Sequence, residues 1–310
     1  MERYKDNGLC DFLKEKYKNN EADSDIKFFD TDKSLLVVAE KKDAEPLCLI
    51  IDDRVKKEAD LENGTESERE HWKLCCMIAQ QAELPLFWIR YVDCEILNNS
   101  DYVHLGIFNK GQKKYGRIQL SQMPTIFSRF KIEAELENRT PQKRKNDSLS
   151  SAFHIWQREC LRVGIFADVD LIRLRGGRVV ELMELKRSYI PFDKWNPYNN
   201  DINNFSILCN FCRKLGNVDF HIVFNAQVNA GLHGSGAELG KYYRRIEKRG
   251  KGDFYDKIDI LKLYRVERRE NVYYYPLPYP VLLGTISLED YLEYGAYEKF
   301  LRERESEERI

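Results

Sequence analysis

Two β-rich apolar runs separated by a pair of glycines constrain this chain more than any other feature. The runs are Val169 to Leu174 and Val179 to Leu185, and the residues between them are Arg175-Gly176-Gly177-Arg178. A Gly-Gly pair between two such runs is typical of a β-hairpin, because glycine adopts the backbone angles of a tight turn at little steric cost. We therefore expect two antiparallel strands over these residues.

The second of these strands carries two charged side chains on one face. Side chains alternate along a strand with a rise of about 3.3 Å per residue, so Glu184 and Lys186 should lie on the same face, roughly 6 to 7 Å apart. Met183 and Leu185 then point into the core. Asp170, near the start of the first strand, can approach Glu184 only if the hairpin bends or splays there. That bend is a structural prediction.

Asp170, Glu184 and Lys186 are the residue types that a metal-dependent phosphodiesterase needs. Two carboxylates bind a hard cation such as Mg²⁺, with Mn²⁺ as an alternative, and leave room for water and phosphate oxygens. The cation offsets charge on the phosphate and lowers the pKa of bound water. Lys186 could orient or deprotonate that water, or stabilise the transition state as a point charge.

The order Asp170, then Glu184-x-Lys186 on the next strand, resembles the signature of the PD-(D/E)xK nuclease superfamily. Val169 stands where the proline of the family name would be. The resemblance implies an α/β fold with a restriction-endonuclease-like mixed-sheet core flanked by helices. A helix from about Asn203 to Leu215 and a strand over 218–224 follow as in the family.

The same resemblance suggests an accessory residue and an activity. A helix over 151–163 carries Glu159, where some family members have a further acidic residue. The implied function is a magnesium-dependent DNA endonuclease, used in restriction or in defence against phages and mobile elements. The alternatives are a structure-specific or RNA-directed nuclease, and a non-catalytic platform that binds nucleic acid or protein.

Chance is the competing explanation for the triplet. The chain is 33% charged, so an Asp and a Glu-x-Lys on neighbouring strands can simply form a solvated face with weak ion pairs. Glu181 competes with Glu184 as a ligand. Its odd offset from Glu184 places it on the opposite face of a regular strand, and we rank it below Glu184.

Two segments offer surfaces for nucleic acid, although the formal net charge is only −1. Residues 241–270 hold eleven Lys or Arg and six acidic residues, with interleaved tyrosines. A solvated charged helix explains that segment equally well. The loop after Lys186 combines amides with aromatic rings, which suits base recognition, or it simply caps the next helix through Asp201 or Asn203. The predicted contact residues are Lys194, Trp195, Asn196, Lys241, Arg244, Arg245, Lys248 and Arg249.

The sequence suggests two domains joined by a polar, basic linker. We expect a smaller α/β accessory domain over residues 1–140, a linker over 141–149 and the nuclease domain over 150–310. Strands over 33–40, 46–52 and 85–92, with a helix over 71–83, weakly resemble a Vsr-like endonuclease fold. Arg54 stands where a catalytic lysine would stand relative to Asp52, and arginine cannot act as a base. An inactive module that binds DNA or a protein partner is one interpretation, and a generic accessory domain is the other.

Composition adds expectations about environment and assembly. No apolar run is long enough to span a bilayer and no secretory signal is visible, so we expect a cytoplasmic protein with no membrane partner. The eight cysteines should be free thiols, and the Cys209-x-x-Cys212 spacing lies in a predicted helix. Residues 271–280 form an aromatic, proline-rich edge segment. A helix from Ser287 carries tyrosines or phenylalanine at 291, 294, 297 and 300 that suggest an interaction face, and a homodimer would suit a nuclease that cuts both strands.

Overall fold

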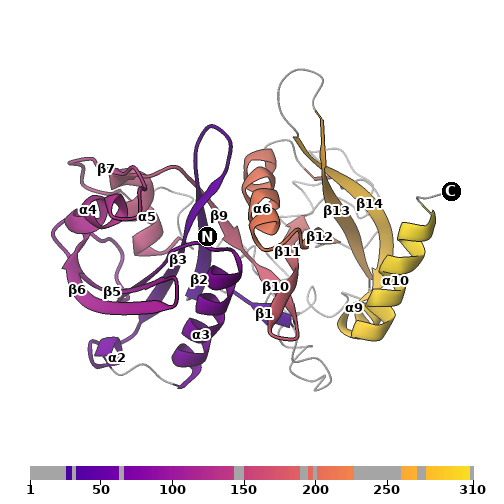
Figure 1. The fold of residues 1–310 in the computed structure, drawn as a ribbon, viewed down its shortest axis with the longest axis horizontal. Helices are drawn as coiled ribbons and strands as arrows, with labels where there is room; N and C mark the ends of the chain where they lie inside the picture. Colours follow the sequence, from indigo (N-terminus) through magenta and orange to yellow (C-terminus); the bar gives the residue numbers. More distant parts are fainter. Residues whose placement is uncertain are drawn as a thin grey trace, which may run out of the picture. The chain divides into compact units, whose positions relative to one another are not determined.

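The chain is of mixed α/β class and divides into two compact units. The computed structural model describes residues 26–29, 33–62, 66–142, 150–188, 195–197, 201–226, 260–270 and 277–307. The larger unit comprises Phe29–Leu182 and Ile202–Asp219, and the smaller unit comprises Met1–Phe28, Met183–Asp201 and Phe220–Ile310. Figure 1 shows their elements along the chain.

A six-stranded mixed sheet forms the centre of the larger unit. The strand order is β6-β5-β4-β3-β2-β9, and all pairs are antiparallel except β3 with β4. That parallel pair needs a crossover, which α2 and α3 supply. The strands are β2 (Lys33–Ala39), β3 (Pro46–Val55), β4 (Leu86–Val92), β5 (Tyr102–Asn109), β6 (Gln112–Gln119) and β9 (Ile165–Val169), and the helices are α2 (Ala59–Glu62) and α3 (Glu66–Gln81).

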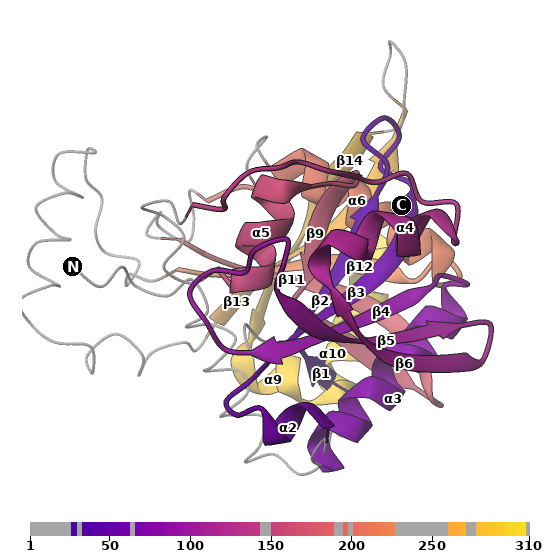
Figure 2. The ribbon, with the colours of Figure 1, turned by 90° about the vertical axis from the view of Figure 1, so that its left-hand side faces the viewer.

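Helices cover both faces of this sheet because its central strands are apolar on both sides. Phe87 of β4 meets Phe127 of α4 (Met123–Ser128) edge to face, with ring centroids 4.9 Å apart. The next residue, Trp88, points to the opposite face and stacks on Trp72 of α3, also at 4.9 Å. Helix α5 (Ala152–Cys160) lies on the same face as α4 (Figure 2). Its Phe153 and Trp156 are buried in one core cluster with Phe87 and Phe127.

The hairpin predicted around the glycine pair is confirmed. Strand β10 (Leu171–Arg175) neighbours β11 (Arg178–Ser188), and Gly176 and Gly177 between them have φ values of 56° and 72°. Positive φ at both central residues is the geometry of a type I′ turn, which matches the twist of the two strands. The side chain of Gln81, at the end of α3, holds the hairpin through two hydrogen bonds. Its Nε2 atom donates to the Val179 carbonyl at 2.9 Å, and its Oε1 atom accepts from the Val179 backbone N–H at 2.8 Å.

The smaller unit contains an antiparallel set of strands closed by two helices. Strand β12 (Asp219–Ala226), which confirms the strand expected over 218–224, pairs with β13 (Ile260–Arg269), and β13 pairs with β14 (Leu277–Ser287). Helices α9 (Leu288–Leu292) and α10 (Tyr294–Glu307) pack on these strands. Ser287 caps α9 by accepting a hydrogen bond from the Asp290 amide at 2.9 Å.

The predicted aromatic interaction face on these helices requires a correction. Tyr291 and Tyr297 are each 1% exposed, and their rings meet edge to face at 5.4 Å. The two side chains therefore form core between the helices and the strands rather than a surface for a partner. The edge segment expected over 271–280 is described only from Leu277, where β14 begins.

The division of the chain also differs from the predicted boundary after residue 140. Strand β9 follows the predicted linker, yet it pairs with β2, with Leu35 opposite Val169 and Ala39 opposite Ile165. Helix α6 (Ile202–Lys214) packs against β2, β3 and β9, and its Asn210 amide donates to the carbonyls of Asp43 and Ala44, both at 2.9 Å. The unit built on the N-terminal strands is thus the larger of the two, and part of the predicted linker, residues 143–149, lies outside the described residues.

The described residues hold four further short elements. They are β1 (Ile26–Phe28), a 3₁₀ turn over Leu120–Gln122, β7 (Glu135–Leu136) and β8 (Leu161–Arg162), the last two forming a small antiparallel pair. No helix in the described ranges has the length and apolar character needed to cross a membrane.

Candidate active site

Glu184 and Lys186 lie on one face of β11, as the strand alternation predicts. The Lys186 Nζ atom is 2.9 Å from Glu184 Oε1, and the two side chains are 23% and 9% exposed respectively. Met183 is buried on the other face of β11. Its Sδ atom accepts a hydrogen bond from the Tyr291 hydroxyl, 3.0 Å away. Core packing on one side of β11 therefore fixes the strand that presents the carboxylate and the ammonium on the other.

Asp201 adds a second carboxylate to this pair. Its Oδ2 atom is 3.6 Å from Lys186 Nζ, and its side chain is 24% exposed. We refer to these three residues as the Glu184–Lys186–Asp201 cluster. From the sequence, Asp201 is predicted only as a helix cap, because it lies fifteen positions after Lys186 and no spacing pattern connects them. An ammonium placed between two carboxylates is oriented by both.

Asp170 lies at a break between two strands rather than inside one. The strand expected over Val169 to Leu174 is interrupted, because Val169 ends β9 beside Leu35 and Leu171 begins β10 beside β11. The Asp170 carbonyl accepts a hydrogen bond from the Phe29 amide at 2.8 Å. The chain changes sheets at this residue, just before the hairpin begins at Leu171.

Asp170 belongs to the larger unit, whereas Glu184, Lys186 and Asp201 belong to the smaller one. The meeting of Asp170 and Glu184 at one cation stays a prediction. Within the described residues, no three His, Cys, Asp or Glu side chains gather closely enough to hold a metal ion.

The two other acidic candidates each have a cationic neighbour in the larger unit. Glu181 Oε2 is 3.0 Å from Arg173 Nε, and both side chains are almost completely buried, at 5% and 2% exposure. Glu181 thus neutralises a buried guanidinium, which explains a carboxylate at that position without a metal. Glu159 on α5 is partly buried and lies 3.1 Å from Arg158 Nε.

The nucleic-acid contacts predicted after Lys186 are only partly described, and one needs correction. Trp195 is 1% exposed, so its indole offers no stacking surface to a base. The ring stacks on Phe224 at 4.0 Å, and the Trp195 carbonyl accepts hydrogen bonds from Lys262 Nζ and the Tyr264 hydroxyl, both at 2.9 Å. Asn196 is exposed beside it. The other predicted contacts, Lys194, Lys241, Arg244, Arg245, Lys248 and Arg249, lie outside the described residues.

The acidic pair at the end of β3 is buried and engaged by protein donors. Asp52 accepts hydrogen bonds from the Ser151 hydroxyl and, at 2.9 Å, from the Tyr91 hydroxyl. Burial raises the pKa of Asp52 to about 6, although these hydrogen bonds oppose the rise.

Asp53, on the opposite face, accepts from Trp88 Nε1 at 2.9 Å and Arg90 Nε at 3.0 Å. Successive carboxylates on a strand point to opposite faces, so Asp52 and Asp53 do not converge on one ligand. Arg54, which the sequence analysis placed in the lysine position, lies 3.9 Å from Asp93.

The cysteines are free thiols wherever the structure describes them. Cys209 and Cys212 lie on α6, as expected, and both are buried. Burial raises the pKa of the Cys212 thiol well above its ordinary value, which disfavours the thiolate that a zinc site requires.

No protein-family model, no curated protein and no solved structure matches this chain.

Proposed function

We propose that the protein is a metal-dependent endonuclease that hydrolyses phosphodiester bonds in DNA. The observation that carries the proposal is the Glu184–Lys186–Asp201 cluster, in which Lys186 Nζ lies 2.9 Å from one carboxylate oxygen and 3.6 Å from another. A partly exposed ammonium beside a carboxylate on the same strand face is the arrangement that the Glu-x-Lys motif requires. A restriction-endonuclease-like core is part of the same proposal.

Asp170 and Glu184 would hold the cation. Carboxylate oxygens are the ligands that Mg²⁺ and Mn²⁺ prefer, and a cation held by two of them keeps sites for water and for phosphate oxygens. When bound, the cation would supply a water of lowered pKa and neutralise charge on the phosphate. Lys186 would orient the attacking water and stabilise the charge that develops on the phosphate as the bond breaks. Asp201 would position the Lys186 ammonium, and Glu159 is proposed as an accessory acid.

The biological role that fits such an enzyme is restriction or defence against phages and mobile elements in the cytoplasm. The competing proposals are cleavage of RNA or of particular nucleic-acid structures, and a binding platform without catalysis. A direct assay separates them.

The assay measures nicking of supercoiled plasmid and of a structured RNA in Mg²⁺, in Mn²⁺ and in EDTA. We expect plasmid cleavage that EDTA abolishes and that Lys186→Ala reduces by about 10²-fold or more, because one preorganised transition-state donor contributes that much. Lys299→Ala is the matched control: this lysine is 77% exposed on α10 and pairs only loosely with Glu303, at 3.9 Å. Cleavage that survives EDTA and Lys186→Ala would refute the mechanism, and cleavage of neither polymer would favour the binding platform.

A further inference from the structure

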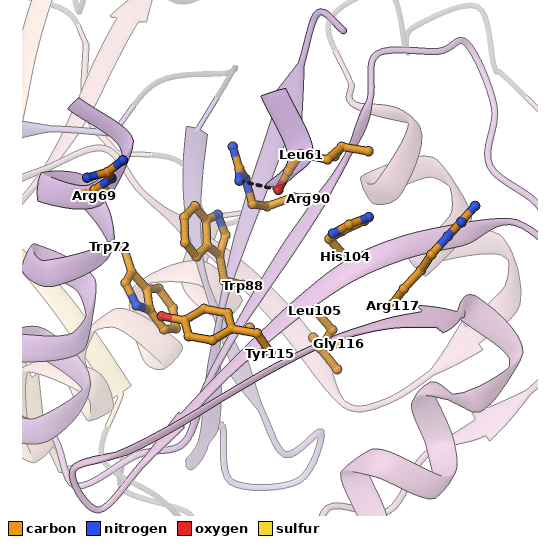
Figure 3. A pocket seen from close by; sticks show the side chains of 11 residues that line it. Leu61, Arg69, Trp72, Trp88, Arg90, His104, Leu105, Tyr115, Gly116 and Arg117 are labelled. Carbon is orange, nitrogen blue, oxygen red and sulfur yellow. Dashed lines mark hydrogen bonds between the residues drawn. The ribbon is translucent and has the colours of Figure 1, made fainter. Parts of the chain in front are cut away.

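A hollow in the larger unit combines aromatic rings with cationic side chains. It lies on the α3 face of the sheet, has a volume of about 550 Å³ and is lined by residues of α2, α3, β4, β5 and β6 (Figure 3). Pockets of about 300 to 1,000 Å³ are the usual size for small organic ligands. The side chains that matter most are those of Arg69, Trp72, Trp88, His104, Tyr115 and Arg117.

The aromatic wall of this hollow ends in an exposed ring. Trp72 and Trp88 are buried and stack on each other with an interplanar angle of 21°, whereas Tyr115 leans against Trp72 at 6.0 Å and is 62% exposed. Gly106 lies opposite Tyr115 in the β5–β6 pairing, and a Cβ there would come within 3.1 Å of Tyr115 Cε1. The missing side chain lets the phenol ring lie across β5. An exposed ring supported in this way is a stacking surface for a planar ligand.

One arginine of the hollow stabilises the wall. The Arg90 guanidinium carbon is 4.7 Å from the centroid of the Trp88 ring, and the group is 3.0 Å from Asp53 and donates to the Leu61 and Asp60 carbonyls at 2.8 and 2.9 Å. Its positive charge is therefore balanced by Asp53 inside the protein. Arg90 helps to shape the hollow but is not the group that would bind an anionic ligand.

The rim carries positive charge that a ligand can meet. Arg69 and Arg117 are exposed, and none of the described residues that line the hollow is acidic. The Arg117 guanidinium lies 4.7 Å from the Tyr102 ring, and Tyr102 is 54% exposed. Arginine binds phosphate through several N–H groups at once, so this rim favours a phosphate-bearing ligand.

The adjoining surface limits how far such a ligand extends. A second hollow of about 360 Å³ shares Leu61, His104 and Arg117 with the first, but its lining includes Glu58 and Asp101. Carboxylates there would repel a second phosphate, so the cationic region suits a single phosphate group.

We propose that this hollow binds a single nucleotide, with its base stacked on Tyr115 and its phosphate at Arg117, two residues along β6 (Figure 3). The nucleotide is either free or one unit of a single-stranded nucleic acid, since both present the same base and phosphate. This site is separate from the proposed cleavage of DNA and needs no metal.

The test measures binding in EDTA, so that it does not depend on cleavage. The ligands are the four common nucleoside monophosphates, the nucleoside adenosine, inorganic phosphate and a short single-stranded DNA, each titrated calorimetrically into the full chain. We expect a monophosphate or the oligonucleotide to bind, and Tyr115→Ala and Arg117→Gln each to weaken binding roughly tenfold, within the range for one stacked base. Binding of the monophosphates identifies a free nucleotide as the occupant, and binding of the oligonucleotide alone identifies a unit of a strand.

A matched pair on the smaller unit serves as the control. The Arg269 guanidinium lies 4.3 Å from the ring of Tyr279, which is 52% exposed on β14. Tyr279→Ala and Arg269→Gln therefore remove an exposed phenol ring and a guanidinium, as the test variants do, but from a different strand surface. These variants should leave binding unchanged. The proposal is overturned if no nucleotide or oligonucleotide binds, or if the control pair weakens binding as much as the Tyr115 and Arg117 variants.

Discussion

Asp52 and Asp53 show how differently two adjacent carboxylates behave on a buried strand. Asp53 faces the Arg90 guanidinium at 3.0 Å, whereas Asp52 accepts from the Tyr91 and Ser151 hydroxyls and its pKa is raised to about 6 by burial. A native pKa above the ordinary value means that the folded protein binds more protons than the unfolded chain between the two values. The contribution of Asp52 to stability is therefore full below about 3.8 and is lost as the pH rises through about 6.

The substitution Asp52→Asn tests this directly. Asparagine keeps one of the two acceptor oxygens, presents an NH₂ donor in place of the other and does not ionise, so the variant should gain stability relative to the natural protein as the pH rises from near 4 to near 7. The gain should be on the order of 3 kcal/mol, since each pKa unit corresponds to about 1.4 kcal/mol. Urea unfolding at the two pH values measures it. A stability difference that stays constant with pH would show that Asp52 is not buried as described.

The sequence predicts which side chains meet only where the two residues are close along the chain. Glu184 and Lys186 are two positions apart on one strand, and alternation alone predicts their shared face. Asp201 is fifteen positions from Lys186, and no local pattern predicts the contact between them. Trp195 likewise looks like a surface aromatic in a polar loop, and its burial depends on Phe224 and Tyr264, which are distant in sequence.

At the scale of elements, two glycines with similar backbone angles have different reasons to be glycine. Gly176 has φ of 56° in the β10–β11 turn, and a Cβ there would meet no atom within 4 Å. Gly164 has φ of 63° just before β9, and a Cβ there would lie 2.0 Å from the Ala39 carbonyl oxygen. The first glycine serves backbone conformation alone, and the second also allows β9 to approach β2.

Alanine substitutions should separate these two roles. Gly176→Ala should cost about 1 kcal/mol of unfolding free energy, the penalty for a left-handed residue with a side chain. Gly164→Ala should cost about 3 kcal/mol or more, because the backbone of β2 or β9 has to shift as well. Gly116→Ala, in open space on β6, is the control and should change stability by less than about 0.5 kcal/mol. Equal costs at positions 164 and 176, measured by denaturant unfolding, would contradict the close approach.

Most of the helices and strands that the sequence predicts in the N-terminal and central parts of the chain are present in the structure. The strands expected over 33–40, 46–52 and 85–92 correspond to β2, β3 and β4, because apolar runs bounded by turn residues are a local signal. The helix expected over 151–163 ends earlier, at Cys160, where Leu161 enters a short strand. The sequence patterns do not predict β5 or β6, and β6 is mostly polar and exposed.

On the scale of the whole molecule, the two units are interleaved along the chain. The larger unit takes β9 and α6 from the part of the sequence that the linker pattern assigned to a separate domain. Polar composition over 137–148 marks a break in hydrophobic pattern, but it carries no information about which strands pair across it. Sheet pairing between residues more than a hundred positions apart is the step that composition could not predict.

A fragment covering residues 150–310 should therefore fail to fold as an independent domain. Without β2 and β3, strand β9 loses its partner and α6 loses the surface that buries Phe205, Leu208 and Phe211. We expect no cooperative urea transition from the fragment and rapid digestion by protease, in contrast to the full chain. A cooperative urea transition, with a denaturant slope (m value) expected for a folded domain of the fragment's length, would support the domain boundary predicted from the sequence.

The central claim is that Asp170 and Glu184 share one divalent cation beside Lys186, and Mn²⁺ binding followed by electron paramagnetic resonance tests it most directly. Asp170→Asn and Glu184→Gln are each titrated with Mn²⁺ beside the natural protein, and Glu303→Gln, an exposed position on α10, serves as the control. The expected result is a bound Mn²⁺ that both single substitutions weaken by tenfold or more and the control leaves intact. Undiminished Mn²⁺ binding in either the Asp170 or the Glu184 variant would contradict the claim.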